Sequence, residues 1–397
     1  MFATLRFVAV LCVCAAAGSS AALAEKIYGP GVTDTEIKLG QTMPYSGPAS
    51  AYGVIGKAHL AYFEMINAQG GVNGRKIRLI SVDDGYSPPK TVEQTRRLVE
   101  EENVFAMFGS LGTAANTAVQ KYLNGKRVPQ VLISAAGMKW NDPKNYPWTL
   151  SFAPNQMAEN RPMVAYLLKA RPRAKIAVLY QNDDFGKDYL RTLKELLPSG
   201  GPIIIAEQSY EATDPTVDSQ IVALKSSGAD TLFYYTSPKF GALALRKTYD
   251  IGWKPLQFIN GPSSSIGAVL KPAGPEKAVG LLTAGFLKDG SDPRWQDDPG
   301  TREWRAWMRQ YLPDVDPSDT IGVYGYTSAQ AMVQVLRQCG DDLTRENLMK
   351  QAASLTEPQL PMLLPGVKVI TTATDYETTR YMQLHRFDGA RWVPLGE

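Results

Sequence analysis

The stretch FAMFGSLGT (residues 105–113) joins an apolar run to a helix-like segment through a loop rich in glycine and hydroxyl groups. The residues that follow, AANTAVQKYL, resume with helical spacing, so the loop lies between a predicted strand and a predicted helix start. The first N–H groups of a helix have no partner within the helix and attract anions. Ser110, Thr113 and the neighbouring backbone amides therefore form a candidate anion site.

This loop does not have the sequence of a nucleotide-binding loop. FGSLGT lacks the Gly-Lys-Ser/Thr ending that places a lysine against the outer phosphates of a nucleotide. The chain also has no GxGxxG after its first predicted strand and no GxSxG nucleophile motif. We therefore expect a smaller anion than a nucleotide, and no cofactor.

Residues suited to acid–base or metal chemistry are sparse. His59 and His385 are far apart and have no neighbouring cysteines, so we interpret both as structural and expect no metal site and no catalytic residue. The pair Asp83-Asp84 stands at the end of a predicted strand. We interpret both residues as structural parts of a turn at the surface of the lobe, without a catalytic role. The sequence favours a binding protein over an enzyme.

The N-terminal segment predicts export. Residues 1–24 contain Arg6, a short apolar run and the small-x-small pattern Ala22-Leu23-Ala24, which is typical of a signal peptide cleaved before Glu25. No later segment is long and apolar enough to cross a bilayer. Cleavage leaves 373 of the 397 residues, too many for one core and suited to two domains.

Cysteine content and charge exclude further classes. After cleavage only Cys339 remains, so no intrachain disulfide can form and stability must come from burial. The 42 basic and 39 acidic residues nearly balance, and no basic run has interleaved aromatic residues. We expect no nucleic-acid partner.

The same order of elements occurs twice along the chain. IKLGQTM, RKIRLISVDDG and VFAMFG are predicted strands separated by helices, and AKIAVLYQ, GPIIIAEQSY and DTLFYYTSP repeat that order. Alternating strands and helices indicate parallel sheets covered on both faces. The predicted fold class is α/β, with two doubly wound parallel-sheet lobes whose binding loops face each other. One long irregular α/β domain is the alternative.

Several motifs, taken in order, resemble a known family. IKLGQTMPYSGPASAYG, INAQGGVNGRKIRLISVDDG, DDFGKDY and ALKSSGADTLFYY are similar to the type I periplasmic solute-binding proteins of ABC transporters, in particular the branched-chain amino acid (leucine/isoleucine/valine) group. The resemblance runs from about Ile37 to the C-terminus. It implies a monomeric periplasmic clamp that closes on a small solute and passes it to a membrane permease. A sensory module that uses the same clamp is an alternative.

The resemblance also implies three segments that cross between the lobes. We place them near residues 149–154, 283–288 and 361–367. The predicted lobes are residues 25–151 plus 287–362 for the first and residues 152–286 plus 363–397 for the second. The C-terminal YMQLHRFDGARWVPLG predicts two short strands that cap the second lobe. The tryptophan-rich stretch after Asp289 is expected at the rim of the first lobe.

By resemblance, the opening loop is a cradle for the carboxylate of the solute. Thr113 matches the family position whose hydroxyl binds that acid group, and Ala135 and Ala136 match the second contact loop. Gly137 stands where the family has a threonine, so a backbone N–H can serve there but a hydroxyl cannot. Charge-assisted hydrogen bonds of this kind contribute roughly 1.5–3 kcal/mol each.

Two aromatic residues match positions at the mouth of the family's cleft. Tyr52 corresponds to the first lobe and Phe185 to the second, and both follow polar turns and precede glycine. We predict that both rings contact the solute. Further wall candidates, each better explained by core or hinge packing, are Tyr235, Tyr324 and Met138.

The segment FINGPSSSIG departs from the amino-acid binders of the family. Those proteins carry an acidic residue after Gly-Pro that accepts hydrogen bonds from the ammonium of the solute, whereas here Ser263 follows. Ser237 stands where those binders have a tyrosine. A buried ammonium without a carboxylate partner is costly. We therefore predict an organic acid with an apolar or aromatic body, with Ser237 and Ser263 contacting its distal oxygens.

An amino-acid solute is the alternative. It requires a negative charge from another loop, and the candidates for that charge are Asp183, Asp184 and Glu211.

Overall fold

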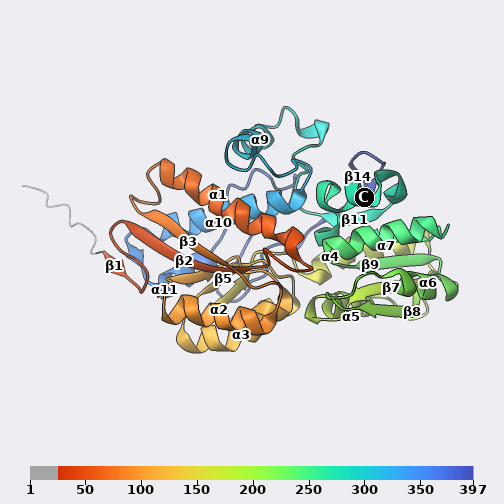
Figure 1. Ribbon diagram of the computed structural model, residues 1–397, viewed down its shortest axis with the longest axis horizontal. Helices are drawn as coiled ribbons and strands as arrows, with labels where there is room; N and C mark the ends of the chain where they lie inside the picture. The colour runs from red at the N-terminus through yellow and green to blue at the C-terminus, as the bar shows by residue number, and fades with distance from the viewer. Residues whose placement is uncertain (1–25, 397) are drawn as a thin grey trace, which may run out of the picture.

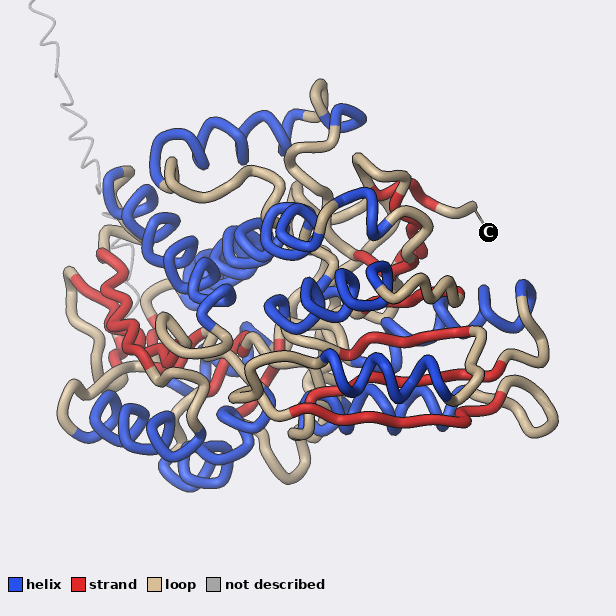
Figure 2. The backbone as a smooth tube through the Cα atoms, turned by 45° about the vertical axis from the view of Figure 1, so that its right-hand side comes forward, coloured by secondary structure: helices blue, strands red, loops and turns tan. Residues whose placement is uncertain are grey.

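The protein is described by a computed structural model that covers residues 26–396, so the predicted signal peptide lies outside the described residues. Two sheets stand side by side, each flanked by helices (Figure 1, Figure 2). We call the part of the chain around the five-stranded sheet the first lobe and the part around the seven-stranded sheet the second lobe. The predicted α/β class with two doubly wound lobes is confirmed.

The sheet of the first lobe is parallel throughout, with the order β3-β2-β4-β5-β6. Its strands are β2 Glu36–Met43, β3 Lys76–Asp83, β4 Ala106–Phe108, β5 Gln130–Ile133 and β6 Thr149–Ser151. Strands β4 and β5 are buried along their whole length because helices cover both faces. This explains why VFAMFG has a continuous apolar run instead of an alternating pattern.

The sheet of the second lobe has the order β14-β13-β11-β10-β9-β7-β8. Its strands are β7 Lys175–Gln181, β8 Ile203–Tyr210, β9 Thr231–Tyr235, β10 Leu256–Ile259, β11 Leu282–Gly285, β13 Gln383–Phe387 and β14 Trp392–Pro394. The first five are parallel, and β13 and β14 add an antiparallel edge. The two strands predicted in the C-terminal tail are confirmed. A short pair, β1 (Ile27–Tyr28) with β12 (Asp342–Leu343), lies apart from both sheets.

Helices cover both faces of the first sheet, with α1 and α10 on one side and α2 and α3 on the other. The helices of this lobe are α1 Gly53–Ala68, α2 Pro88–Glu100, α3 Thr113–Lys126, α9 Pro299–Tyr311, α10 Thr320–Cys339 and α11 Arg345–Ala352. The close approach of α1 and α10 requires Gly325, where a Cβ would lie 2.9 Å from the Ile55 carbonyl oxygen. None of the helices between residues 26 and 396 combines the length and apolar character of a membrane span.

In the second lobe, α4 (Gln156–Ala170) and α5 (Asp184–Leu196) pack on one face. Helices α6 (Asp218–Ser226) and α7 (Pro238–Asp250) pack on the other, and the short α8 (Lys271–Ala273) follows β10. Side-chain caps fix the starts of the first pair: Asn155 accepts from the Ala158 amide at 2.9 Å, and Asp183 accepts from the Gly186 amide at 3.2 Å. These caps set the positions of the first helical turns that face the other lobe.

The chain passes between the lobes three times within the described residues. It leads from β6 into α4, from β11 into the loop before α9, and from the loop after α11 into β13. The last two segments run side by side, since the Leu364 amide donates to the Phe286 carbonyl at 2.9 Å. Val369 and Tyr376 pack in the core of the first lobe, beyond the predicted boundary at residue 362. The detailed lobe limits stay a prediction.

Candidate functional site

A cavity of about 200 Å³ lies between the lobes. Loops that follow β4, β5, β10 and β11 contribute to its wall, so it stands at the carboxyl ends of the strands of both sheets. This is where open α/β sheets bind ligands. Most of the wall is apolar or aromatic, with a few polar groups among the lining residues. Cavities of this composition suit small organic molecules.

The candidate anion loop forms part of this wall. Gly112 has φ 102° and directly precedes α3, which starts at Thr113. The Thr113 hydroxyl donates to the Ala136 carbonyl at 3.2 Å, and the Ser151 hydroxyl donates to the Ala135 carbonyl at 2.8 Å. The first bond joins the start of α3 to the loop after β5, and the second joins that loop to the end of β6.

Five of the predicted site residues line the cavity, and four do not. The lining residues are Tyr52, Thr113, Ala135, Ala136 and Phe185. The other four, which stand behind the wall, are Ser110, Gly137, Ser237 and Ser263. The structure therefore brings together the predicted acid cradle and both predicted aromatic residues, whose contact with a solute stays a prediction.

The three serines that stand behind the wall form hydrogen bonds within the protein. The Ser110 hydroxyl accepts from the Thr42 amide at 3.1 Å. The Ser237 hydroxyl lies 3.4 Å from the Tyr210 hydroxyl. Ser263 is fully buried and donates to the Thr236 carbonyl at 2.5 Å. The predicted contacts of Ser237 and Ser263 with the distal oxygens of a solute are therefore not supported by their placement.

Gly137 has a packing reason to be glycine. A Cβ at this position would lie 2.7 Å from Nε1 of Trp140, whose ring is buried. The threonine that the resemblance leads us to expect therefore does not fit unless the indole moves. The indole occupies the space of the missing hydroxyl group.

Aromatic rings from both lobes line the cavity. Tyr52 and Tyr86 come from the first lobe, and Phe185 and Tyr189 come from α5 of the second. Phe185 and Tyr189 meet edge to face, with ring centroids 5.2 Å apart. Tyr86 has no motif that marks it in the sequence, and it follows a turn after Asp83-Asp84. Tyr324, one of the further wall candidates, also lines the cavity.

The sequence analysis missed an acidic residue in the wall. Glu159 lies in the first turn of α4, is 3% exposed and lines the cavity. Its Oε2 accepts from the Tyr189 hydroxyl at 2.5 Å, and its Oε1 accepts from the Gly261 amide at 2.6 Å. Burial raises the pKa of Glu159 to about 7, against the opposing effect of these two hydrogen bonds.

Glu159 reaches the Gly-Pro loop after β10 from a different element. Its carboxylate lies beside Gly261, in the loop where the related amino-acid binders carry their own acidic residue. The cleft therefore holds an acidic side chain, which comes from α4 and not from the Gly-Pro loop or from any of the three candidate residues. A glutamate at a helix start gives no sequence signal for this role, because helix starts often carry acidic residues.

The three acidic residues considered as alternatives do not line this cavity. Asp183 caps α5 and accepts from the Tyr86 hydroxyl at 3.3 Å, and Asp184 pairs with Lys139 at 2.7 Å. Glu211 accepts from the Asn182 side chain. Asp183 and Asp184 are thus used for contacts between the lobes.

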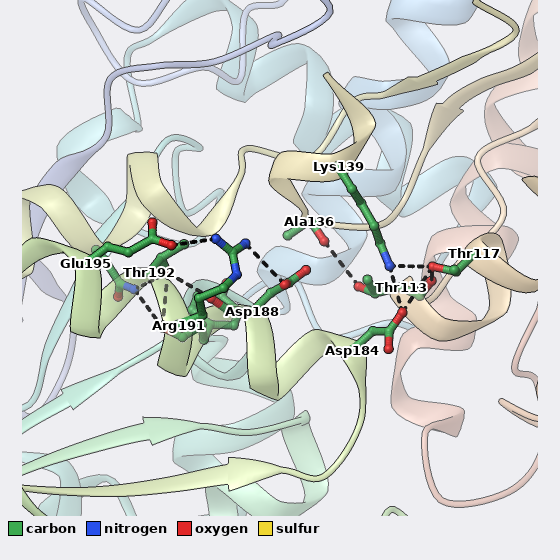
Figure 3. Close-up of polar contacts among 11 residues, drawn as sticks. Thr113, Thr117, Ala136, Lys139, Asp184, Asp188, Arg191, Thr192 and Glu195 are labelled. Carbon is green, nitrogen blue, oxygen red and sulfur yellow. Dashed lines mark hydrogen bonds and ion pairs between the residues drawn. The ribbon is translucent and has the colours of Figure 1, made fainter. Parts of the chain in front are cut away.

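A polar cluster ties the lobes together beside the cavity (Figure 3). We call it the latch. Asp184 of α5 accepts from Lys139 at 2.7 Å and from Thr117 of α3 at 3.2 Å. Lys139 also donates to Thr117 at 2.6 Å. At another contact between the lobes, Ser265 donates to Asp319 at 2.8 Å. The lobes are therefore in contact across the cleft.

The cavity extends past the crossing segments to the C-terminal strands. Its wall there includes Asp289, Trp295, His385 and Trp392. The C-terminal tail, which the sequence predicts as a cap of the second lobe, thus also contributes Met382, His385 and Trp392 to the cavity wall. Burial lowers the pKa of His385 to about 4, so this ring is neutral at neutral pH.

The other histidine is structural. His59 is fully buried, lies 2.8 Å from the Gln41 side chain and 2.8 Å from the Ser328 hydroxyl. Burial lowers its pKa to about 3. Among residues 26–396, no group of three or more histidine, cysteine, aspartate or glutamate side chains is arranged to hold a metal ion.

Two α/β lobes enclose a cavity at their strand ends, an arrangement suited to holding a small molecule between them. The sequence profile of a family described as "Periplasmic binding protein" matches residues 36–391. The chain belongs to this family, which confirms the resemblance seen in its motifs. The family is one of solute-binding proteins.

Known relatives agree with this assignment. "Leu/Ile/Val-binding protein homolog 7" of Brucella abortus (strain 2308) is 24% identical over 321 residues, covering 78% of this chain and 79% of the relative.

Solved structures share the fold. A branched chain amino acid ABC transporter protein from Thermus thermophilus with bound valine superimposes with a TM-score of 0.83 at 18% identity, covering 92% of this chain and 97% of that one. A fatty acid ABC transporter substrate-binding protein from Thermomonospora curvata gives a TM-score of 0.77 at 24% identity, covering 93% and 94%.

Proposed function

We propose that this protein is the extracytoplasmic solute-binding component of an ABC importer and captures an organic acid with an apolar or aromatic body. The lobes close on the acid in the periplasm, and the closed protein, acting as a monomer, delivers it to a membrane permease. Residues 1–24 direct export. The observation that carries the proposal is the cavity itself, with the start of α3 in one wall and mainly apolar walls elsewhere.

The acid group of the solute binds at the loops after β4 and β5. The start of α3 offers N–H groups without helical partners. The Thr113 hydroxyl beside them donates to the Ala136 carbonyl at 3.2 Å, so it has to turn from that carbonyl to donate to the acid group. The side chains of Ala135 and Ala136 in this part of the wall are small, which lets a carboxylate approach the backbone. Each charge-assisted hydrogen bond contributes roughly 1.5–3 kcal/mol.

The body of the solute lies between the aromatic rings. Tyr52 and Phe185 face the cavity from opposite lobes, so closure places apolar surface on two sides of the ligand. Burying apolar surface contributes about 25 cal/mol per Å². The Thermomonospora curvata neighbour, described as a fatty acid binder, supports an apolar carboxylate as the class of solute.

An amino acid is the second candidate, and Glu159 is the observation that favours it. A carboxylate beside Gly261 stands where an ammonium can be received, and the Brucella relatives are named as Leu/Ile/Val-binding protein homologs. Each oxygen of Glu159 already accepts one hydrogen bond from the protein, and a carboxylate oxygen has two lone pairs, so these bonds leave room for an ammonium. Against an amino acid stands the pKa of Glu159, about 7, which leaves this carboxyl only partly ionised at neutral pH. We therefore prefer the organic acid.

Two measurements on the exported protein test the proposal. Native mass spectrometry of protein purified without refolding identifies any solute that it retains. Thermal denaturation of ligand-stripped protein with leucine, glutamate, benzoate and hydroxycinnamates then ranks the classes. A ligand at one hundred times its dissociation constant adds about 2.7 kcal/mol of stability, which shifts the melting temperature visibly. Stabilisation by leucine and by none of the aromatic acids would reverse our preference.

A further inference from the structure

Asp289, a residue in the cavity wall beyond the crossing segments, has a carboxylate oxygen without a partner among residues 26–396. Asp289 lines the cavity and is 8% exposed. Its Oδ1 accepts from the Ser291 amide at 2.8 Å and from the Ser291 hydroxyl at 2.7 Å. Its Oδ2 is buried and has no hydrogen-bond partner among residues 26–396. Leaving a buried carboxylate oxygen unpaired costs free energy, so the arrangement calls for a donor.

The turn that carries Asp289 is held rigidly. Gly290 packs so closely on the buried Trp304 that a Cβ would lie 2.0 Å from its ring. The Gly290 carbonyl also accepts from Arg305 at 2.6 Å. Since Ser291 fixes one oxygen of Asp289, the other is fixed as well. A polar group that is held in a fixed position and has no partner can bind a ligand group without first rearranging.

The rest of this end of the cavity favours an uncharged polar group on an apolar body. The surrounding wall includes Leu364, Met382 and Trp392. The other charged lining residue at this end, Arg294, donates to Asp292 Oδ2 at 2.6 Å and to the Trp392 carbonyl at 2.5 Å. The guanidinium is thus already engaged, which makes it a weaker receptor for a second carboxylate.

We propose that this end of the cavity, which we call the distal subsite, binds the far end of the solute, and that Asp289 Oδ2 accepts a hydrogen bond from a hydroxyl group there. The inference rests on the proposed function, since it assumes a carboxylate held near Thr113. The solute is then an elongated hydroxy acid, with its acid group at the first lobe, its apolar body between the rings and its hydroxyl at Asp289.

Titration calorimetry with matched acids tests the distal subsite. The probes are straight-chain acids of increasing length in unsubstituted, terminal-hydroxy and terminal-amino forms, together with hydrocinnamate and its para-hydroxy form. For the length that fits, we expect the wild-type protein to bind the hydroxy acid about tenfold more tightly than the unsubstituted acid. This comparison needs no variant and is therefore independent of any effect on folding.

Variants then assign the preference to Asp289. Asp289→Leu is expected to remove most of the tenfold preference, because it removes the acceptor oxygen. Asp297→Asn is the matched control, because Asp297 is exposed in the same segment and does not line the cavity. It should keep the full preference.

The outcomes separate the two proposals. Unsubstituted and hydroxy acids that bind equally well to the wild type would overturn the distal subsite and leave the proposed function standing. A preference that persists in Asp289→Leu would also overturn the assignment. Tighter binding of the terminal-amino acids would show an ammonium site in place of the hydroxyl site. Failure of every acid to bind would overturn both proposals.

Discussion

At the scale of single residues, the polar chemistry of the cleft divides between Thr113 on the first lobe and Glu159 on the second. Thr113 stands at the start of α3, where an anion is stabilised by the N–H groups and the helix dipole. Glu159 is buried and acidic, so it stabilises a hydrogen-bond donor and disfavours an anion. A carboxylate solute therefore has one preferred orientation, with its acid group at the first lobe.

Thr113 provides a direct test of that orientation. Thr113→Val removes the hydroxyl, and we expect the affinity for the carboxylate ligand to fall by about tenfold or more, because a charge-assisted hydrogen bond contributes roughly 1.5–3 kcal/mol. Thr113→Ser keeps the hydroxyl and should retain affinity within about threefold. Titration calorimetry measures both, and equal affinity of the valine variant and the wild type would place the acid group elsewhere.

Glu159 predicts how stability depends on pH. Burial raises the pKa of this carboxyl to about 7 from its ordinary value of 4.5, so the folded protein holds a proton that the unfolded chain has lost. The contribution of Glu159 to the free energy of unfolding is therefore complete below pH 4.5. It declines by up to about 3 kcal/mol as pH rises towards 7. Above pH 7 no further change is expected from this residue.

The comparison with Glu159→Gln isolates this effect. Both buried histidines, whose lowered pKa values act in the opposite direction, are the same in the two proteins. Urea unfolding at several pH values should show that the free energy of unfolding of the wild type falls relative to the variant between about pH 4.5 and 7. Parallel pH profiles for the two proteins would mean that Glu159 is not protonated in the folded state.

At the scale of elements, the helix starts on the two sides of the cleft form the contact between the lobes. Helix α3 and the loop at Lys139 belong to the first lobe, and α5 belongs to the second, so the latch can exist only when the lobes are close (Figure 3). The Lys139 and Asp184 side chains are 32% and 45% exposed. Ion pairs with such exposure contribute about 0–1 kcal/mol.

The latch predicts a modest effect on ligand release. Asp184→Asn is expected to raise the dissociation rate of the solute by up to about fivefold, because it weakens a contact of the closed state alone. Asp188→Asn is the matched control, since Asp188 lies on the same helix and pairs with Arg191 of the same lobe. Stopped-flow release kinetics measure both rates, and equal acceleration in the two variants would argue against the latch.

The elements themselves could largely be predicted from the sequence. Continuous apolar runs such as VFAMFG identify central parallel strands, and the glycine-rich loop before Thr113 identifies a helix start at the cleft. Tyr52 and Phe185 could be placed because they match aromatic positions of the family and each follows a polar turn. Strands and helix starts can be read from a short stretch of sequence, because they depend mainly on residues that are neighbours along the chain.

Residues that depend on packing between distant elements could not be placed. Glu159 reaches Gly261 across 102 positions of sequence, and Asp289 and Trp392 meet the cavity from different segments. Ser237 and Ser263 were predicted to face the solute, but their hydroxyls bond to neighbouring strand ends. Motif position identifies the loop that a side chain belongs to and leaves its direction open.

At the scale of the whole molecule, the two lobes and their crossing segments enclose the cavity from several sides. The cavity reaches from the loops of the first sheet to the C-terminal strands on the second sheet. The length of the solute therefore determines whether it can contact both lobes at once and hold them closed. A solute that spans the cavity contacts both lobes and the crossing segments together. Its binding energy can then be used to hold the lobes closed.

The central claim is that the clamp selects an acid without an α-amino group, and titration calorimetry with matched pairs tests it most directly. Isocaproate is leucine without its amino group, and hydrocinnamate is phenylalanine without its amino group. We predict that the ligand-stripped protein binds the better of these two acids at least about tenfold more tightly than the corresponding amino acid, because burying an ammonium beside a partly neutral Glu159 is costly. Tighter binding of leucine or phenylalanine than of its matched acid would contradict this account.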